Sequence, residues 1–219
     1  MSVVAVDGPV GSGKSTVARR VAARLGYLYL DTGAMYRAVG LLATEAGAAL
    51  DDGEAVVALA RSAGLRFDGD GRLFAGERDV SDAIRTLEVG AAASRVSALP
   101  GVRGLLVEEQ RRLAGDTDIV MEGRDIGTNV FPDAAVKVYL SARPDVRAAR
   151  RAAELRAGGD EVDDAQVLAA LLERDRRDST RAVAPLRRAA DAVELDTSDM
   201  TLDEVVEAVV GIARSQAQP

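Results

Sequence analysis

Residues 8–15 have the side-chain types and the spacing that most clearly predict chemistry in this chain. They read GPVGSGKS, in which glycines precede one lysine and one hydroxyl. Glycines allow the backbone to form a concave loop whose amide N–H groups point at phosphate oxygens. In such a P-loop, Lys14 reaches the β and γ phosphates of a nucleotide and Ser15 ligates Mg²⁺. The residues that we expect to bind the nucleotide are Gly8, Pro9, Val10, Gly11, Ser12, Gly13, Lys14, Ser15 and Thr16.

Lysine is rare in this chain, which makes its place in the loop informative. Of the 28 Lys and Arg residues, only Lys14 and Lys137 are lysines. A guanine-reading Asn-Lys-x-Asp motif needs a second lysine with asparagine before it, and Lys137 follows Val136, so this motif is excluded. The sequence also lacks an apolar strand that ends in a lone aspartate for nucleotide hydrolysis. The P-loop therefore predicts nucleotide binding, and other residues have to identify the reaction.

The composition narrows the possible chemistry. The chain has 219 residues, which suits one domain, and it contains neither cysteine nor histidine, so thiol and imidazole catalysis are excluded. The net charge of −7 argues against a general nucleic-acid surface. The longest uncharged run, residues 165–172, is far shorter than the roughly 18 residues that span a bilayer. We expect a cytoplasmic monomer without a signal peptide that binds neither membranes nor nucleic acids.

The elements that must position these residues follow from the apolar pattern. Apolar strands alternate with amphipathic helices, which predicts an α/β fold with a mostly parallel sheet flanked by helices. Strands are expected at residues 3–7, 27–30, 118–121, 136–140 and 192–195. Helices are expected at 15–25, from within 31–37 towards 45, and at 52–62, 87–98, 102–113, 144–157, 163–178 and after a capping box at 201–204. Residues 65–80, interrupted by turn residues at 68–71, predict an antiparallel hairpin or meander in a separate small lobe. Lys137 is interpreted as an edge or rim residue.

Two predicted strand ends carry further charged residues. The segments 31–37 (DTGAMYR) and 122–125 (EGRD) follow strands, and such junctions bind ligands in open α/β sheets. Transfer of a γ-phosphoryl group needs positive charge around the phosphate and an aligned acceptor. Arginines on the helical hairpin 144–178 would supply that charge, and closure of the hairpin would exclude water. A phosphate monoester acceptor is largely a dianion at neutral pH and needs no general base, whereas for an alcohol acceptor Asp125 could serve.

Together these segments resemble bacterial-type cytidylate kinases, a family of P-loop kinases that act on nucleoside monophosphates. The likeness rests on residues 7–15, 31–37, 84–86, 122–128, 131–134 and 174–186, and it covers nearly the whole chain. It implies a P-loop kinase core, a helical lid and a small β-containing insert that binds the nucleoside monophosphate. On this division the core comprises residues 1–62, 115–142 and 189–219, the insert 63–114 and the lid 143–188.

The resemblance also implies a reaction and roles for individual residues. ATP with Mg²⁺ would phosphorylate CMP or dCMP to the diphosphate. Arg37 and Arg124 would hold the acceptor phosphate, and Asp178 with Arg174 the pentose. Ser94, Arg103 and Arg181 would read the cytosine, Thr32 and Asp125 complete the acceptor contacts, and the catalytic set is Lys14, Arg124, Asp125, Arg150 and Arg151.

Two residues depart from the family pattern, and other interpretations stay open. Thr32 and Glu122 stand where family members can carry Ser and Asp, so the reach of both side chains differs. Arg150 and Arg151 could lie on a solvated helix face, and Ser94 could serve helix packing alone. The alternative functions are a P-loop kinase of another small phosphorylated metabolite and a non-catalytic nucleotide switch. Turnover that depends on a particular acceptor would distinguish these hypotheses.

Overall fold

The computed structural model describes residues 1–69 and 71–216 of the chain. The chain divides into two compact units, here named the first and the second unit. The first consists of Met1–Tyr29 with the chain from Asp116 onward, and the second of Leu30–Gly115. Within the described residues, no helix combines the length and the apolar character that a membrane crossing needs.

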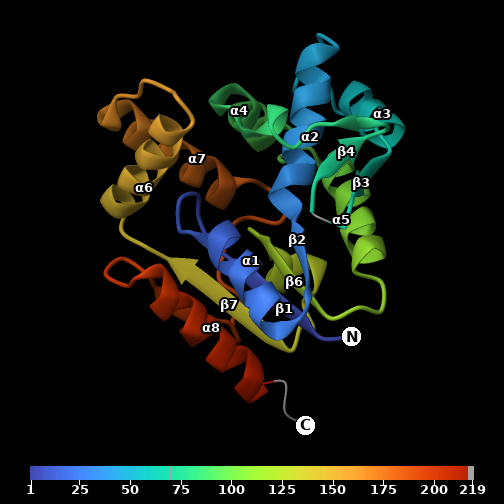
Figure 1. The fold of residues 1–219 in the computed structure, drawn as a ribbon. Helices are drawn as coiled ribbons and strands as arrows, with labels where there is room; N and C mark the ends of the chain where they lie inside the picture. Colours follow the sequence, from blue (N-terminus) through green and yellow to red (C-terminus); the bar gives the residue numbers. More distant parts are fainter. Residues whose placement is uncertain (70, 217–219) are drawn as a thin grey trace. The chain divides into compact units, whose positions relative to one another are not determined.

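A five-stranded sheet forms the centre of the first unit (Figure 1), and only Leu30 and Asp31, at the end of one edge strand, belong to the second unit. Its strands, in spatial order, are β2 (Leu28–Asp31), β6 (Ile119–Gly123), β1 (Val3–Asp7), β7 (Val136–Ser141) and β8 (Val193–Asp196). β1 is parallel to both β6 and β7, and β7 is parallel to β8. Every residue of β1 and β6 is buried, as their apolar runs predict for parallel strands. The predicted α/β fold with a mostly parallel sheet is confirmed, with strand ends shifted by one or two residues.

Two amphipathic helices, α1 (Lys14–Leu25) and α8 (Leu202–Gln216), pack against each other and against the strands (Figure 1). Their apolar faces form one core with β1, β6 and β7 that consists almost entirely of Val, Ala and Leu, as the low aromatic content requires. The predicted capping box begins α8: the Thr201 N–H donates to the Glu204 carboxylate, and the Glu204 N–H donates to the Thr201 hydroxyl. This packing sets the direction in which α1 leaves the P-loop.

The predicted helical hairpin consists of α6 (Pro144–Ala157) and α7 (Asp164–Thr180). The Asp163 carboxylate caps α7 by accepting the N–H groups of Ala165 and Gln166. The two helices bury a small cluster of their own, which consists of Ala148, Ala152, Leu155, Val167 and Leu171. Val10 of the P-loop packs against this cluster, so the hairpin and the loop are in direct contact.

The first unit differs from expectation at Lys137. We expected an edge or rim residue, but β7 is an inner strand and Lys137 is buried. Its ammonium donates to the carbonyl oxygen of Pro132 and pairs with the Asp191 carboxylate at 2.7 Å. The prediction was wrong because a partner 54 residues away leaves no signal in the local pattern. A short π-helix, η2 (Ile126–Val130), is also present and was not predicted.

The second unit combines helices with a small antiparallel sheet. Among its described residues, the elements are α2 (Thr32–Glu45), α3 (Gly53–Ser62), β3 (Leu65–Phe67), β4 (Leu73–Ala75), β5 (Arg78–Asp79), the 3₁₀ helix η1 (Ala83–Arg85), α4 (Leu87–Val96) and α5 (Pro100–Ala114). The order β3-β4-β5 confirms the predicted meander, although Asp70 of its first turn lies outside the described residues. Pro100 lies in the first turn of α5, as expected from its fixed backbone φ angle.

The core of the second unit explains where this unit begins. Met35 and Val39 of α2 are completely buried in the same cluster as Val56 of α3 and Leu73 of β4. The compact unit therefore starts at Leu30, whereas the sequence-based division assigned residues up to 62 to the core. The functional division into core, insert and lid stays a prediction.

Candidate active site

The P-loop has the backbone geometry that its glycines predict. Gly11 and Gly13 have φ angles of 74° and 86°, in the left-handed region that favours glycine. A Cβ atom at Gly11 would lie 2.8 Å from the carbonyl oxygen of Arg147, and one at Gly8 would lie 2.2 Å from that of Leu140. The loop is therefore packed tightly against β7 and α6, and only glycine fits at these two positions.

Lys14 is buried at the start of α1, with 5% of its surface exposed. Its ammonium donates to the carbonyl oxygen of Pro9 at 2.8 Å, which bends the side chain back over the loop. Burial, and next the charge of Arg124, lower the pKa of Lys14 to about 7, while Glu122 and Asp7 act in the opposite direction. A phosphate anion at this position would relieve the cost of the buried charge.

The N-terminal end of α1 is arranged for an anion. Gly13 is its N-cap residue, and among the described residues no side chain caps this end. Its first turn contains no acidic residue and exposes the hydroxyl-bearing residues Ser15 and Thr16. The partial positive charge of the helix end is thus left for a ligand, as in other phosphate-binding loops.

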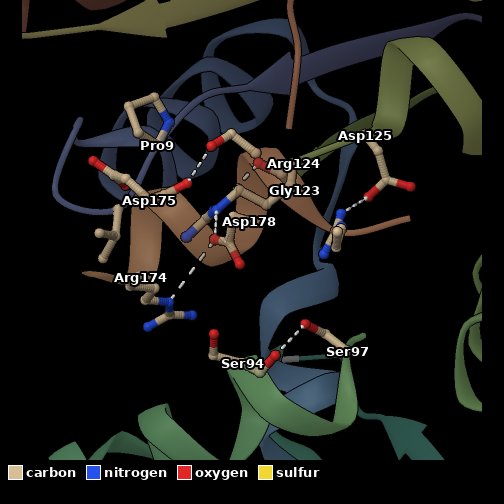
Figure 2. Close-up of polar contacts among 12 residues, drawn as sticks. Pro9, Ser94, Ser97, Gly123, Arg124, Asp125, Arg174, Asp175 and Asp178 are labelled. Atoms are coloured by element: carbon tan, nitrogen blue, oxygen red, sulfur yellow. Dashed lines mark hydrogen bonds and ion pairs between the residues drawn. The ribbon is translucent and has the colours of Figure 1, made fainter. Parts of the chain in front are cut away.

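β6 ends in a cluster of charged residues in the first unit. The Arg124 Nε donates to Asp178 Oδ2 at 3.1 Å, and the Arg174 Nε lies 4.0 Å from the same oxygen (Figure 2). Asp178 is buried, whereas the two arginine side chains are about one fifth exposed. One buried carboxylate therefore lies close to two guanidinium groups, which are the kind of donor that matches phosphate oxygens.

A second ion pair lies beside the first. The Arg181 Nη2 donates to Asp125 Oδ1 at 3.3 Å, and both side chains are less than 10% exposed. The Asn129 amide donates to the other Asp125 oxygen at 3.1 Å, and the Arg181 Nε donates to the carbonyl oxygen of Ala184 at 2.7 Å. Ala184 has a positive φ of 48°, which is unusual for a residue with a side chain. Asp125 and this turn together orient the Arg181 guanidinium.

Glu122, one of the two departures from the family pattern, is buried at the end of β6. The Tyr29 hydroxyl donates to its Oε1 at 3.1 Å, and the Arg19 guanidinium lies over the Tyr29 ring, 4.8 Å from its centre. The longer glutamate side chain is therefore directed by a hydroxyl from the neighbouring strand β2. Sequence reasoning named Glu122 but missed Tyr29, because the pairing of β2 with β6 cannot be read from local patterns.

The arginines of α6 have different surroundings. The buried Arg147 donates to the carbonyl oxygen of Val10 at 3.0 Å and to Asp175 at 2.6 Å, so it joins the P-loop to α7. Arg150 donates to the hydroxyl and to the carbonyl oxygen of Thr197, and Arg151 pairs with Glu154 at 2.7 Å. Sequence reasoning selected Arg150 and Arg151 and missed Arg147. Its position next to the buried stripe of Ala148, Ala152 and Leu155 is the signal that could have identified it.

The second unit contains its own group of predicted acceptor residues. Ser94 and Arg103 are buried, and Ser97 joins them: its hydroxyl donates to the Ser94 carbonyl (Figure 2), and its carbonyl accepts from Arg103 at 3.4 Å. Among the described residues the Ser94 hydroxyl has no hydrogen-bond partner. Gly40 of α2 allows this close packing, because a Cβ there would lie 2.8 Å from the Ala93 nitrogen. The hydroxyl is thus buried by helix packing but is not used by it.

The strand-to-helix junction at the start of α2 holds the remaining two residues. Asp31 caps α2 by accepting the Ala34 N–H at 2.9 Å and pairs with Arg85 at 3.2 Å. Thr32 is buried in the first turn, and Arg37 one turn later donates to the carbonyl oxygen of Ile84 at 3.2 Å. η1 therefore fixes both the cap of α2 and the Arg37 guanidinium.

Comparison with known proteins identifies the family. The family model described as cytidylate kinase matches residues 4–215. A cytidylate kinase of Solibacter usitatus is 49% identical over 98% of this chain and 93% of its own length. That of Methylococcus capsulatus is 45% identical over 97% of both chains.

A solved structure supports the fold independently. Shikimate kinase from Acinetobacter baumannii matches with a TM-score of 0.51 over 100% of this chain and 96% of its own, at 16% identity. This likeness concerns the fold alone, which is that of a P-loop kinase. With the family model and the relatives covering nearly its whole length, the chain belongs to the cytidylate kinase family and is a nucleoside monophosphate kinase.

Proposed function

We propose that this enzyme transfers the γ-phosphoryl group of ATP to CMP and to dCMP, which yields ADP and the cytidine or deoxycytidine diphosphate. The observation that carries the proposal is that the positive charge of Arg124 lowers the pKa of Lys14. Lys14 belongs to the loop proposed for the donor phosphates and Arg124 to the cluster proposed for the acceptor phosphate. Two phosphate groups that would repel each other could therefore be held by these two cations.

The donor side of the proposal consists of residues 8–16. Their backbone N–H groups and the N-terminal end of α1 would bind the phosphates of ATP, and Lys14 would leave Pro9 to contact the transferring group. Arg150 and Arg151 would join them only after their side chains leave Thr197 and Glu154. Closure of this hairpin would also exclude water from the reaction.

The acceptor roles are assigned residue by residue. Arg37 and Arg124 would hold the CMP phosphate, because guanidinium groups match phosphate geometry. Cytosine offers acceptors at O2 and N3 and a donor at its amino group, which suits guanidinium donors and a hydroxyl. The residues assigned to the base are Ser94, Arg103 and Arg181, those assigned to the pentose are Arg174 and Asp178, and Thr32 and Asp125 support these contacts.

The donor atoms near the P-loop fit a magnesium ion that is held mainly by the nucleotide. Among the described residues no three His, Cys, Asp or Glu side chains are grouped to hold a metal by themselves. Mg²⁺ keeps several waters and often binds through substrate phosphates and few protein oxygens, so the exposed Ser15 hydroxyl is a suitable ligand. When bound, the ion neutralises charge on the β and γ phosphates.

The chemical step needs positioning more than proton transfer. An oxygen of the CMP phosphate attacks the γ-phosphorus of ATP, the bond from that phosphorus to the bridging oxygen breaks, and its electron pair leaves with ADP. Lys14 and Arg124 stabilise the charge that both phosphates bring together. Since the acceptor phosphate is already largely a dianion at neutral pH, Asp125 acts by orienting Arg181 and is not required as a base.

A panel of acceptors tests the proposal. ADP release is measured with ATP, Mg²⁺ and each of CMP, dCMP, UMP, AMP and GMP. We expect the highest kcat/KM with CMP and dCMP; turnover with another acceptor but neither of these would refute the assignment, and nucleotide binding without acceptor-dependent turnover would favour the switch. Light scattering of the same preparation reports whether the enzyme is the expected monomer.

A further inference from the structure

The turn that follows residues 122–125 is held by two buried, charged side chains of neighbouring strands. Residues 126–132 leave β6, include η2 and lead towards the start of β7. In the sheet, β1 lies between β6 and β7, so this turn meets the end of β1, where Asp7 lies. Side chains of β1 and β7, namely Asp7 and Lys137, can therefore reach this turn.

Asp7 binds the beginning of the turn. Its Oδ1 accepts the N–H of Ile126 at 2.9 Å and its Oδ2 accepts the N–H of Gly127 at 2.8 Å. Asp7 is 95% buried, and burial raises its pKa to about 6 although both hydrogen bonds act in the opposite direction. Each carboxylate oxygen thus fixes the orientation of one peptide group.

Lys137 contacts the turn at two further points. Its aliphatic chain packs on Gly127, where a Cβ atom would lie 3.1 Å from the Lys137 Cδ and 3.2 Å from its Cγ. Its ammonium donates to the carbonyl oxygen of Pro132 at the far end of the turn. The partner carboxylate of Asp191 is two thirds exposed, so only the lysine is buried in this pair.

The turn is continuous with the residues proposed for the acceptor. The carbonyl oxygen of Asp125 accepts the N–H groups of Asn129 and Val130 at 2.9 and 3.1 Å, so the Asp125 backbone is part of η2. Arg124 precedes it directly, and its side chain pairs with Asp178. A shift of the turn would therefore move Arg124 and Asp125 together.

We propose that Asp7 and Lys137 are positioning residues that hold the turn 126–132 and thereby orient Arg124 and Asp125 for binding of the nucleoside monophosphate. This rests on the proposed function, because that function assigns Arg124 and Asp125 to the acceptor. It also explains why the chain buries two charged groups at a place where an apolar pair would avoid the cost of desolvation.

The variant Lys137→Met tests this inference, since methionine keeps an unbranched side chain and removes the ammonium. Calorimetry measures the Kd of CMP and of a non-hydrolysable ATP analogue, and steady-state kinetics measure KM, kcat and the ratio of kcat/KM for CMP over UMP. We expect the KM for CMP to rise by about tenfold and the preference over UMP to narrow, with ATP affinity changed by less than about twofold. A role in stability alone would lower the Tm and leave the KM for CMP and the preference unchanged.

Two further variants keep the test decisive. Gly127→Ala retains every charge but presses a methyl group on the Lys137 chain, and we expect about a threefold rise in the KM for CMP. If Lys137→Met does not fold, this variant decides the matter. Asp191→Asn removes only the exposed partner, and we expect nearly unchanged kinetics.

The outcomes separate this inference from the proposed function. Wild-type protein without turnover of CMP would refute the proposed function. Normal turnover in the wild type, with an unchanged KM for CMP in folded Lys137→Met or Gly127→Ala, would refute the positioning role alone. Equal losses of ATP and CMP affinity, or an Asp191→Asn variant as impaired as Lys137→Met, would also overturn it, because the effect would then not act through the turn.

Discussion

The two lysines of this chain are both buried in the first unit, but their surroundings differ. Lys137 is 7% exposed, and its charge is matched by the Asp191 carboxylate and the Pro132 carbonyl. Lys14 is 5% exposed and donates to the Pro9 carbonyl, and the positive charge of Arg124 acts on it more strongly than the negative charge of any single carboxylate. The charge of Lys137 is therefore matched within the fold, whereas the charge of Lys14 would be matched by a bound anion.

This difference shows how to recognise a functional charge. A buried cation with a carboxylate partner is neutralised within the fold, so it needs no ligand. A buried cation near other cations raises the free energy of the protein without ligand, and an anionic ligand removes that cost. Burial alone would have placed both lysines in one class, and the electrostatic environment separates them.

The largest effect that we expect from this comparison is on catalysis. Lys14→Met should lower kcat by about 10³-fold or more, because it removes a charge from the transferring phosphate. Lys137→Met should keep kcat within about tenfold of the wild type, since its effect falls on acceptor binding. Saturating steady-state kinetics of both variants check this, and similar losses of kcat would contradict the division between the two lysines.

The same two variants should change stability in opposite directions. The pKa of Lys14 falls from 10.5 to about 7 on folding, so between these values the unfolded chain binds more protons and the contribution of Lys14 to stability improves as the pH rises. The free-energy cost of burying the charged Lys14 is therefore at its full value below about pH 7. There we expect Lys14→Met to stabilise the fold by a few kcal/mol, which is the size of effect that this pKa shift implies. Lys137→Met should destabilise it by about 1–2 kcal/mol, because the Pro132 carbonyl loses its donor.

Chemical denaturation at several pH values checks these signs. The advantage of Lys14→Met over the wild type should shrink steadily from neutral pH towards pH 10, because the folded wild type is then neutral at Lys14. A Lys14→Met variant that is less stable than the wild type at neutral pH would show that this charge is already neutralised without a ligand.

The smallest expected effect is a proton exchange with solvent. With a pKa of about 7, Lys14 is mostly neutral at pH 8, and binding of triphosphate should raise this pKa so that about one proton is taken up. Calorimetry of a non-hydrolysable ATP analogue in buffers with different ionisation enthalpies measures the uptake. Lys14→Met should abolish it and Lys137→Met should retain it; uptake that survives in Lys14→Met would assign the proton to another group.

Much of the fold could be predicted because it depends on neighbouring residues in the chain. The strand of Val3–Asp7, the loop and the helix α1 follow from apolar spacing and from glycine chemistry, and the capping box at Thr201 was correct in detail. The π-helix η2 could not be predicted, since its first N–H groups are bound by Asp7, which lies 119 and 120 residues away.

The candidate site was predictable in its residue types but not in their partners. The sequence selected Arg124, Asp125 and Arg181 as candidates, which stay a prediction, yet nothing in it pairs Arg181 with Asp125 or Arg124 with Asp178. Arg147 shows the same limit: its contacts with Val10 and Asp175 depend on how α6 packs against the P-loop and α7.

By itself, the sequence determined the phosphate-binding loop, the order of the main strands and helices, an antiparallel segment at residues 65–80 and the family. These depend on local backbone preferences and on the pattern of apolar residues, which are read directly along the chain. Only the tertiary structure decided that Lys137 is paired and that Lys14 has a lowered pKa. The physical reason is that desolvation and Coulomb interactions depend on distances through space, and folding sets those distances between residues far apart in sequence.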